Sequence, residues 1–216
     1  MPAATVIVLR DQPCGVETLL LRRNSRLGFA GGMWVFPGGR VDEVDAHADE
    51  EVAARRAAVR EASEEAGIAL DADLLVPFAH WTPDVESSHR RFATWFFVAE
   101  ATPGSVVIDG GEIVDHVWVG AAAALGLHAA GEVELLPPTF VTLVELAAHD
   151  TVAEALAAAR RRGVPRYFTR MVRVDGATVA LWDGDAGYEA RDPRAEGPQH
   201  RLLMGELPWR YLKRRP

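Results

Sequence analysis

One run of acidic residues constrains this chain more than any other feature. Residues 60–68 read REASEEAGI, and a helix ending at Gly67 would place Glu61, Glu64 and Glu65 at positions i, i+3 and i+4. That spacing brings three carboxylates onto one face within about one turn. Because like charges so close destabilise a helix, the pattern favours a bound cation that prefers oxygen ligands, such as Mg²⁺ or Mn²⁺. The alternative is a solvated surface helix that ends at a glycine cap.

The rest of the expected helix, residues 49–66, favours a binding site over a solvated face. When the helix is projected at about 100° per residue, its predicted core stripe consists of four apolar residues: Val52, Val59, Ala62 and Ala66. The glutamates fall on the opposite side, beside two more acids and three alanines: Glu50, Glu51, Ala54, Ala57 and Ala58. The helix contains no lysine to pair with the acids. A carboxylate face with small alanines around it leaves room for ions and a substrate.

The acidic segment is similar to half of a known motif, the Nudix box, G-x5-E-x7-R-E-U-x-E-E-x-G-U with U aliphatic. Residues 60–68 fill each fixed position of its second half, with Ala62 as a small U residue, and Pro37, Gly38 and Gly39 lie upstream. The chain therefore resembles the Nudix hydrolases. The resemblance implies a mixed-sheet α/β/α sandwich and metal-dependent hydrolysis of a diphosphate linkage between a nucleoside and another moiety.

The first half of the box departs from the pattern. Arg60 follows Gly39 by 21 positions, which is about seven more than the pattern has. Counted back from Arg60, the register of the box glutamate falls on Val52, and either neighbour, Glu50 or Glu51, is a candidate replacement. We expect the extra residues to lengthen the loop before the helix, with Asp49 or a nearby residue capping its N-terminus.

The long loop also suggests a subgroup. Together with LLLRRNSRLGFAGGMWVFPGG, RRFATWFFVAE and LLPPTF, it resembles the peroxisomal coenzyme A diphosphatases and their bacterial relatives. The resemblance implies coenzyme A or acyl-CoA as favoured substrate, with ADP-ribose, nucleotide sugars and dinucleotides as alternatives in the same class. Two other kinds of protein share this fold: a non-catalytic nucleotide-sensing regulator and an isomerase of isoprenoid diphosphates. The intact acids argue against the regulator, and Cys14, in an expected turn, argues against the isomerase.

The resemblance also assigns roles within the box. Three glutamates would bind the metal ions, with Glu61 also a candidate for activating water: Glu61, Glu64 and Glu65. A backbone carbonyl of Gly38 or Gly39 would complete the ligand set. Arg60 would hold a glutamate in position through a bidentate pair, as structural support for the catalytic residues.

Outside the box the assignments rest on fewer signals. A further metal-binding acid is expected before a strand that ends in tryptophan, and GEIVDHVWV offers Glu112, with Asp115 as the alternative. Of four arginines near the glycines (Arg22, Arg23, Arg26 and Arg40), we assign Arg22 and Arg40 to substrate phosphates. Trp81 is the candidate for stacking on a base. Each of these residues also has an ordinary alternative as a surface or core side chain.

Composition excludes several classes. A net charge of −8 over 216 residues argues against binding nucleic acid through its backbone, which needs a basic surface. The apolar N-terminal run is too short for a signal peptide or a membrane span, so we expect no membrane association. The lone cysteine suits a reducing cytoplasm, and the C-terminal RRP is not a known targeting signal. We therefore expect a cytoplasmic enzyme that acts on a small nucleotide-type molecule, and we leave open a homodimer.

Hydrophobic patterning predicts an α/β chain with two parts. Expected strands cover residues 4–10, 17–22, 33–36, 74–81, 92–100 and 113–119. An alanine-rich helix follows to about His128. We assign residues 1–130 to a Nudix core and residues 131–216 to an extension packed on the core or continuing it. The extension should contain helices at 139–149 and 151–162, a hairpin at 170–182 and a last strand near 200–204.

Overall fold

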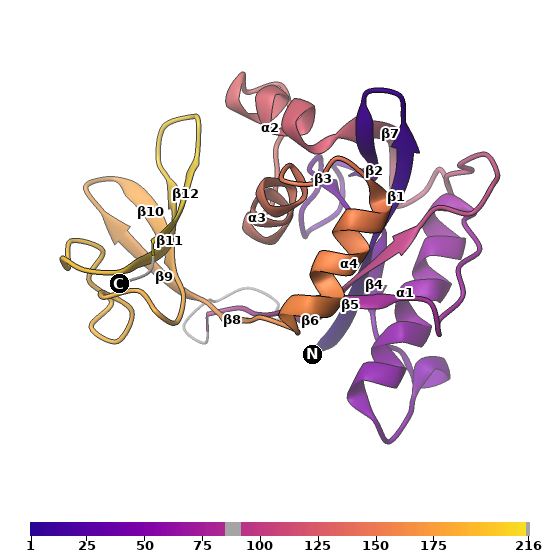
Figure 1. The fold of residues 1–216 in the computed structure, drawn as a ribbon, viewed down its shortest axis with the longest axis horizontal. Helices are drawn as coiled ribbons and strands as arrows, with labels where there is room; N and C mark the ends of the chain where they lie inside the picture. The colour runs from indigo at the N-terminus through magenta and orange to yellow at the C-terminus, as the bar shows by residue number, and fades with distance from the viewer. Residues whose placement is uncertain (85–91, 215–216) are drawn as a thin grey trace.

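The computed structural model describes residues 1–84 and 92–214, which form two β-sheets and four α-helices (Figure 1). Most of the predicted loop 82–91 and the C-terminal residues 215–216 therefore lie outside the described residues. The larger sheet contains eight strands: β1 (Pro2–Gln12), β2 (Gly15–Arg23), β3 (Trp34–Val35), β4 (Gly38–Arg40), β5 (Val76–Thr82), β6 (Ala93–Glu100), β7 (Ile113–Gly120) and β8 (Arg166–Phe168).

The larger sheet is mixed. Its strand order is β3-β2-β1-β6-β5-β8, with β4 also paired to β1 and β7 also paired to β2. The pairs β1–β6 and β5–β8 are parallel, and the other pairs are antiparallel. The short strand β8 comes from the C-terminal part of the chain, and its parallel pairing with β5 extends the first sheet.

Helices cover both faces of this sheet (Figure 1). On one face lies α1 (Glu50–Ala66), and on the other lie α3 (Pro137–Leu146) and α4 (Val152–Arg162), whereas α2 (Ala121–Ala129) follows β7. Alternate residues of the central strand β1 point to opposite faces, because side chains in a strand alternate. Val6 and Val8 pack in the cluster under α1, and Ile7 and Leu9 pack in the cluster under α3 and α4. The predicted α/β/α sandwich with a mixed sheet is confirmed.

The acidic helix begins and ends with capping residues. The Asp49 carboxylate accepts the backbone N–H groups of Glu51 and Val52, and so satisfies donors that have no partner inside the helix. At the other end Gly67 adopts a left-handed conformation with φ of 66°, which a glycine reaches without strain. These two residues limit α1 to 17 residues and place the acidic run in its last two turns.

The prediction of which side of α1 faces the core is right for Ala62 and Ala66 and wrong for Val52 and Val59. Val52 and Val59 are only half-buried, whereas five alanines are buried: Ala54, Ala57, Ala58, Ala62 and Ala66. The small side chains of these alanines let the helix backbone lie close to β1 and β6, which a stripe of larger residues would prevent. Ala54, Ala57 and Ala58, which were expected to surround the carboxylates, thus belong to the packing face together with Ala62 and Ala66. Glu65 lies at the edge of that face and is itself buried.

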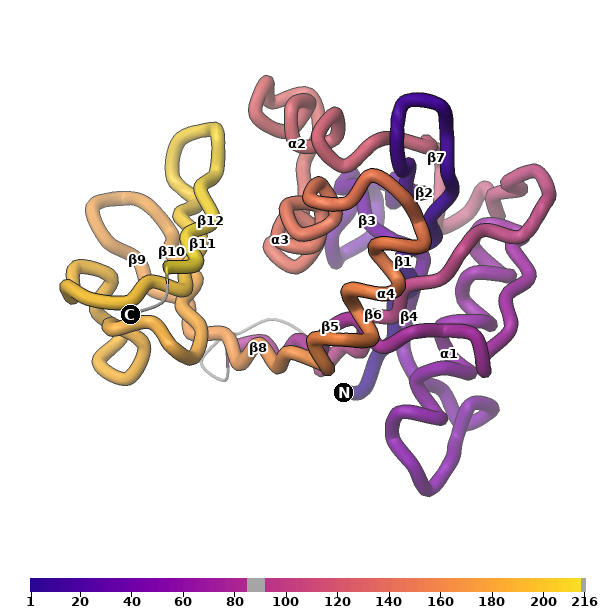
Figure 2. Tube along the Cα trace, viewed as in Figure 1, coloured from indigo at the N-terminus to yellow at the C-terminus, as the bar shows by residue number. Residues whose placement is uncertain are grey.

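A second sheet forms the C-terminal part of the chain (Figure 1). Its four antiparallel strands have the order β12-β11-β10-β9: β9 (Arg170–Val174), β10 (Ala177–Leu181), β11 (Gln199–Met204) and β12 (Arg210–Arg214). In Figure 2 the chain passes from α4 through β8 into this sheet. None of the helices in the described ranges has the length and apolar character that crossing a membrane requires.

The second sheet contains a buried ion pair that should stabilise it. The Arg201 guanidinium donates to both carboxylate oxygens of Asp185 at 2.7 Å, and the backbone N–H groups of Gly187 and His200 donate to the same carboxylate at 2.8 Å. Burial alone would raise the pKa of Asp185, but these hydrogen bonds outweigh it and hold the pKa below its usual value.

We expect Asp185→Asn to lower the free energy of unfolding at pH 7 by about 3–5 kcal/mol, because Arg201 would keep a buried charge without its partner. A lowered carboxyl pKa stabilises the fold above the unfolded-state value and loses that effect as pH falls. The difference between the two proteins should therefore shrink below about pH 4. Urea unfolding at several pH values measures it. Asp175→Asn, which removes the exposed pair with Arg194, is the control and should change stability little.

Candidate active site

Strand β4 brings two glycines against the C-terminal half of α1. Gly38 and Gly39 pair with Thr5 and Ala4 of β1, so their positions are set by the sheet. The backbone N–H of Gly38 donates to Oε2 of Glu65 at 2.9 Å. A Cβ on Gly39 would overlap the carboxylate of Glu61. Backbone without side chains thus lies directly against two of the three predicted carboxylates.

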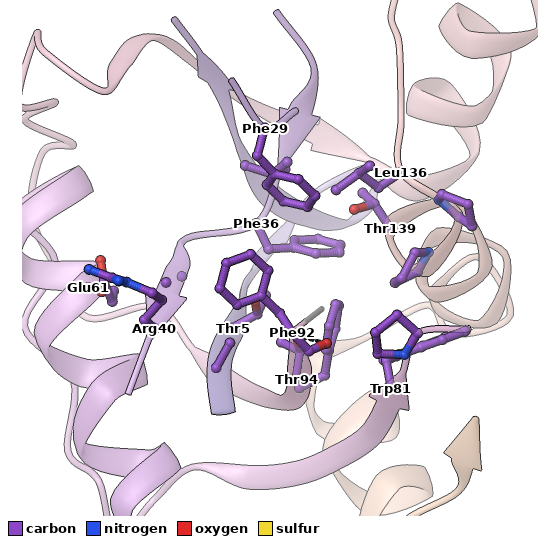
Figure 3. A pocket seen from close by; sticks show the side chains of 18 of the residues that line it. Thr5, Phe29, Phe36, Arg40, Glu61, Trp81, Phe92, Thr94, Leu136 and Thr139 are labelled. Atoms are coloured by element: carbon purple, nitrogen blue, oxygen red, sulfur yellow. Dashed lines mark hydrogen bonds between the residues drawn. The ribbon is translucent and has the colours of Figure 1, made fainter. Parts of the chain in front are cut away.

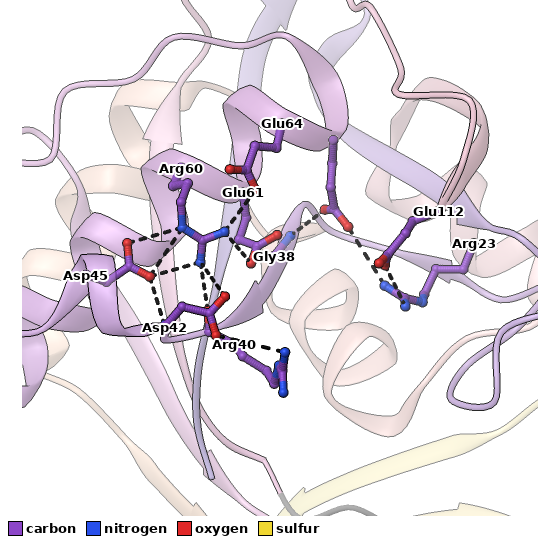
Figure 4. Close-up of polar contacts among 10 residues, drawn as sticks. Arg23, Gly38, Arg40, Asp42, Asp45, Arg60, Glu61, Glu64 and Glu112 are labelled. Atoms are coloured by element: carbon purple, nitrogen blue, oxygen red, sulfur yellow. Dashed lines mark hydrogen bonds and ion pairs between the residues drawn. The ribbon is translucent and has the colours of Figure 1, made fainter.

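Arg60 holds the acidic side chains in place (Figure 4). Its Nη1 donates to Glu61 and to Glu64, both at 2.9 Å. Its Nε and Nη2 donate to the Asp45 carboxylate, with the shortest contact at 2.9 Å, and Nη2 also donates to the Arg40 carbonyl. This network raises the pKa of Arg60, most strongly through the bonds to Asp45. The guanidinium therefore links the loop before α1 to the carboxylates on α1.

Asp45 is the residue that the sequence interpretation missed. It ends a short 3₁₀ helix, η1 (Glu43–Asp45), and its side chain is buried. Counted forward from Gly39, Asp45 stands at the position where the box pattern G-x5-E has its glutamate. The bidentate pair from Arg60 reaches this carboxylate, so the residue that pairs with Arg60 in the structure is Asp45, and neither of the two candidates Glu50 and Glu51 does so. The seven extra residues follow Asp45, and counting forward from the glycine would have found it.

Glu50 and Glu51 have other partners. Oε1 of Glu50 accepts from the Trp95 indole at 3.2 Å, and Oε1 of Glu51 accepts from Arg55 at 2.7 Å in an i,i+4 pair. Neither lies in the network around Arg60. These two acids belong to the start of α1, about three to four turns away from the carboxylates of the box.

Two carboxylates of the site are buried enough to alter their acidity. Burial raises the pKa of Glu65 to about 8, although the N–H of Gly38 opposes the shift. Burial also raises the pKa of Glu61, against the opposing charge of Arg60. Glu64, by contrast, is 59% exposed. A nearby cation stabilises the ionised form of such a buried carboxylate, because the cation offsets the loss of hydration.

An arginine, Arg23, connects Glu112 to the carboxylates of α1. The Arg23 guanidinium lies 3.2 Å from Glu112 and 3.8 Å from Glu65, and joins the start of β7 to α1 (Figure 4). Asp115, the alternative to Glu112, instead pairs with Arg22 at 3.3 Å. Glu112 lines the cavity described below, and Asp115 and Arg22 do not. Metal binding by Glu112 and phosphate binding by Arg22 remain predictions.

The carboxylates form one end of a cavity of about 880 Å³ (Figure 3). Arg40 and Trp81, both predicted to bind substrate, line it together with Arg23, Gly38 and Gly39. Beyond the charged end, the described part of the lining is mostly apolar and aromatic: Phe29, Val35, Phe36, Trp81, Phe92, Phe96, Leu136, Pro137 and Pro138. The volume lies in the upper part of the range of ligand pockets, about 300–1,000 Å³.

Comparison with known families agrees with this geometry. Residues 1–138 match the NUDIX domain family, which is more than half of the chain. The chain belongs to the Nudix family. The matched segment contains the acids of α1, the glycines of β4 and Arg60, and the protein is a Nudix hydrolase that acts on diphosphate linkages.

Individual relatives agree with this assignment. The Nudix hydrolase is 32% identical over 193 residues to "Putative 8-oxo-dGTP diphosphatase 3" of Mycobacterium tuberculosis, an alignment covering 85% of this chain and 78% of the relative. A crystal structure of a NUDIX hydrolase from Alicyclobacillus acidocaldarius is similar in fold, with a TM-score of 0.67 and 24% identity. The match covers 72% of this chain and 95% of that one. The NUDIX domain of Shewanella oneidensis NrtR, complexed with ADP ribose, has a TM-score of 0.52 and 16% identity over 68% of this chain and 86% of that one.

Nudix hydrolases generally use divalent metals such as Mg²⁺ or Mn²⁺, and the chemistry of this site fits such ions. Carboxylate and carbonyl oxygens are the ligands that these cations prefer, and Glu61 and Glu65 are buried with raised pKa values. Within the described ranges, no three acidic, histidine or cysteine side chains already converge in a metal-site arrangement. Arg60 and the Gly38 N–H hold these oxygens instead.

The two glycines of β4 should respond differently to substitution. We expect Gly39→Ala to leave the protein folded but to lower kcat/KM about tenfold, because the new methyl group displaces only the flexible carboxylate of Glu61. A methyl group on Gly38 would overlap the carbonyl of Ala4 and lie 2.7 Å from Cα of Thr5. Gly38→Ala should therefore destabilise the fold by about 1–3 kcal/mol. Thermal unfolding and steady-state kinetics on both variants distinguish the two effects.

Proposed function

We propose that this Nudix hydrolase uses Mg²⁺ or Mn²⁺ to cleave a diphosphate that joins a nucleoside to another moiety, with coenzyme A or an acyl-CoA as favoured substrate. One observation carries the proposal: the carboxylates of α1 and a long apolar region line the same cavity. A diphosphate at the acidic end would leave the groups attached to it room in the apolar part.

Residues at the acidic end suit the diphosphate. Glu61, Glu64 and Glu65, with the Gly39 carbonyl and Glu112 as further candidates, would hold the cations. A divalent cation held there neutralises phosphate charge and acidifies water. Arg23 and Arg40 also line the cavity at this end, and either guanidinium can donate to phosphate oxygens. Arg60 keeps the carboxylates in position through its bonds to Glu61, Glu64 and Asp45.

The apolar end suits an uncharged group. Phe29 and Phe92 lie with ring centroids 5.6 Å apart, and Phe36 and Phe96 lie 6.4 Å apart edge to face. Aromatic side chains of this kind accept planar bases and apolar chains. Coenzyme A carries both an adenine and an uncharged pantetheine chain on its diphosphate, which supports it as the favoured substrate. ADP-ribose, nucleotide sugars and dinucleotides belong to the same chemical class.

An oxidised nucleoside triphosphate is the second candidate. The observation that favours it is the 32% identity to the mycobacterial relative named for 8-oxo-dGTP. Such a substrate has a base and a sugar on one side only, and its remaining phosphates would need cationic partners. Among the residues that the structure describes, the arginines that line the cavity are Arg23, Arg40 and Arg60, and these three lie at its acidic end.

A panel of substrates tests the proposal. The purified protein is incubated with Mg²⁺ or Mn²⁺ and coenzyme A, acetyl-CoA, ADP-ribose, a dinucleoside polyphosphate or 8-oxo-dGTP, and the products are identified by mass. We expect coenzyme A to yield 4′-phosphopantetheine and 3′,5′-ADP, and EDTA to abolish the reaction. If kcat/KM for 8-oxo-dGTP exceeds that for coenzyme A by about tenfold or more, the second candidate replaces the first.

A further inference from the structure

The second sheet contributes directly to the substrate cavity. Thr169, just before β9, Met171 on β9 and Trp182, just after β10, line the same cavity as the carboxylates of α1. These residues come from the C-terminal part of the chain, beyond the segment that matches the family at residues 1–138. The cavity therefore has one wall that the shared Nudix fold does not supply.

A buried carboxylate fixes this wall to the catalytic core. Asp84 follows β5, and its side chain is only 3% exposed. It accepts two bonds from the Arg191 guanidinium at 2.8 and 2.9 Å, and one from the backbone N–H of Met171 at 2.6 Å. Arg191 has a φ of 51°, a left-handed conformation that a non-glycine residue seldom adopts. One carboxylate thus joins β5, β9 and the turn that contains Arg191.

Aromatic packing holds the same junction. The Trp81 ring on β5 stacks on Tyr167 with centroids 3.8 Å apart, and lies edge to face with Trp182 at 5.6 Å. The Trp182 indole N–H donates to the Thr169 hydroxyl at 3.0 Å. Each of these rings is almost fully buried. Because buried aromatic contacts and a buried ion pair act together, the position of the wall is fixed relative to the carboxylates.

We propose that this wall selects the substrate. The side chain of Met171 borders the uncharged group attached to the diphosphate. Asp84 is the positioning residue, because its bond to the backbone N–H of Met171 fixes the position of Met171. The inference rests on the proposed function, because the acidic end must take the diphosphate for the attached group to reach the wall. The group that fits is planar or apolar, since the flexible thioether of Met171 borders this part of the cavity, in front of the buried Trp182 ring. Phosphates would stay at the other end, with the arginines.

The test compares two methionines of the same sheet. Met171 and Met204 are both half-buried and both pack against the same hydrophobic cluster, but Met204 does not line the cavity. We expect Met171→Ala to raise KM about tenfold for the substrate that the panel identifies, with kcat within about twofold of the unaltered protein. Met204→Ala should leave both constants unchanged. Circular dichroism and thermal unfolding check that both variants fold.

A second variant tests the role of Asp84. Asp84→Asn keeps an acceptor for the Met171 N–H but removes the charge that pairs with Arg191. It should raise KM in the same way as Met171→Ala, with kcat again little changed. Loss of the buried pair should lower the melting temperature in either case. A purely structural role would do only that, and would leave KM unchanged. Equal KM values for Met171→Ala, Met204→Ala and the unaltered protein would overturn the inference.

Binding without turnover separates this inference from the proposed function. In EDTA, coenzyme A and ADP-ribose are titrated against tryptophan fluorescence, because Trp81 and Trp182 line the cavity. If the ligand binds more weakly to Met171→Ala but not to Met204→Ala, the role of the wall is supported even when no panel member is hydrolysed. The absence of hydrolysis would contradict only the proposed function. If neither ligand binds the unaltered protein, or if both methionine variants bind equally, the inference is wrong.

Discussion

Glu65→Gln should lower kcat by about two to three orders of magnitude without lowering the stability of the metal-free protein. Glutamine has nearly the same shape and still accepts the N–H of Gly38, but it cannot give a cation a negatively charged oxygen. Burial raises the pKa of Glu65 to about 8, so the ionised side chain opposes folding at pH values above the unfolded pKa when no cation is bound. Removing that charge should leave the melting temperature in EDTA equal or higher.

The measurement combines kinetics with thermal unfolding at about pH 7.5, with and without Mg²⁺. Mg²⁺ should raise the melting temperature of the unaltered protein more than that of Glu65→Gln, because a ligand that binds the folded state stabilises it. Glu64→Gln should lose turnover to a similar degree, and it too should fold, since Glu64 is exposed. Glu51→Gln is the control on the same helix. Full metal-dependent activity in Glu65→Gln would rule out this site.

Local sequence predicted the parts of the site that lie within one element. The spacing of Glu61, Glu64 and Glu65 depends only on the period of a helix, and Asp49 and Gly67 limit that helix by capping that is also local. The side of α1 that faces the core was harder to predict. Alanine is only weakly hydrophobic, so Val52 and Val59 decided which side of the helical projection was taken as the core. Close packing of the helix on the sheet favoured the smaller alanine side chains instead.

Contacts between distant parts of the chain could not be predicted in this way. Asp84 and Met171 are 87 positions apart, and no periodicity relates them. The strand β8 is only three residues long and joins the first sheet by pairing with β5, which depends on where α4 ends. The insertion in the box presented a different difficulty. A count backward from Arg60 and a count forward from Gly39 give different residues, and only the ion pair of Arg60 with Asp45 decides between them.

That ion pair carries the second large prediction, for Asp45→Ala. We expect kcat/KM to fall by about 100-fold, because Arg60 would lose its anchor and the carboxylates of Glu61 and Glu64 would lose their fixed position. Asp45 is buried and accepts bonds from both Nε and Nη2 of Arg60, so the free energy of unfolding should also fall by about 1–3 kcal/mol.

Loss of stability alone does not distinguish a positioning role of Asp45 from a merely structural one. A conservative variant distinguishes the two roles. The box pattern has glutamate where this chain has Asp45, so Asp45→Glu should restore most of the activity that alanine loses. Asp45→Asn, which keeps the shape but not the charge, should restore stability more than activity. The readouts are kcat/KM and the Mg²⁺ concentration for half-maximal rate, which should rise in Asp45→Ala and Asp45→Asn. If Asp45→Asn matches the unaltered protein in both, the charge on residue 45 does not position the metal-binding carboxylates, and Arg60 orients them through its other bonds.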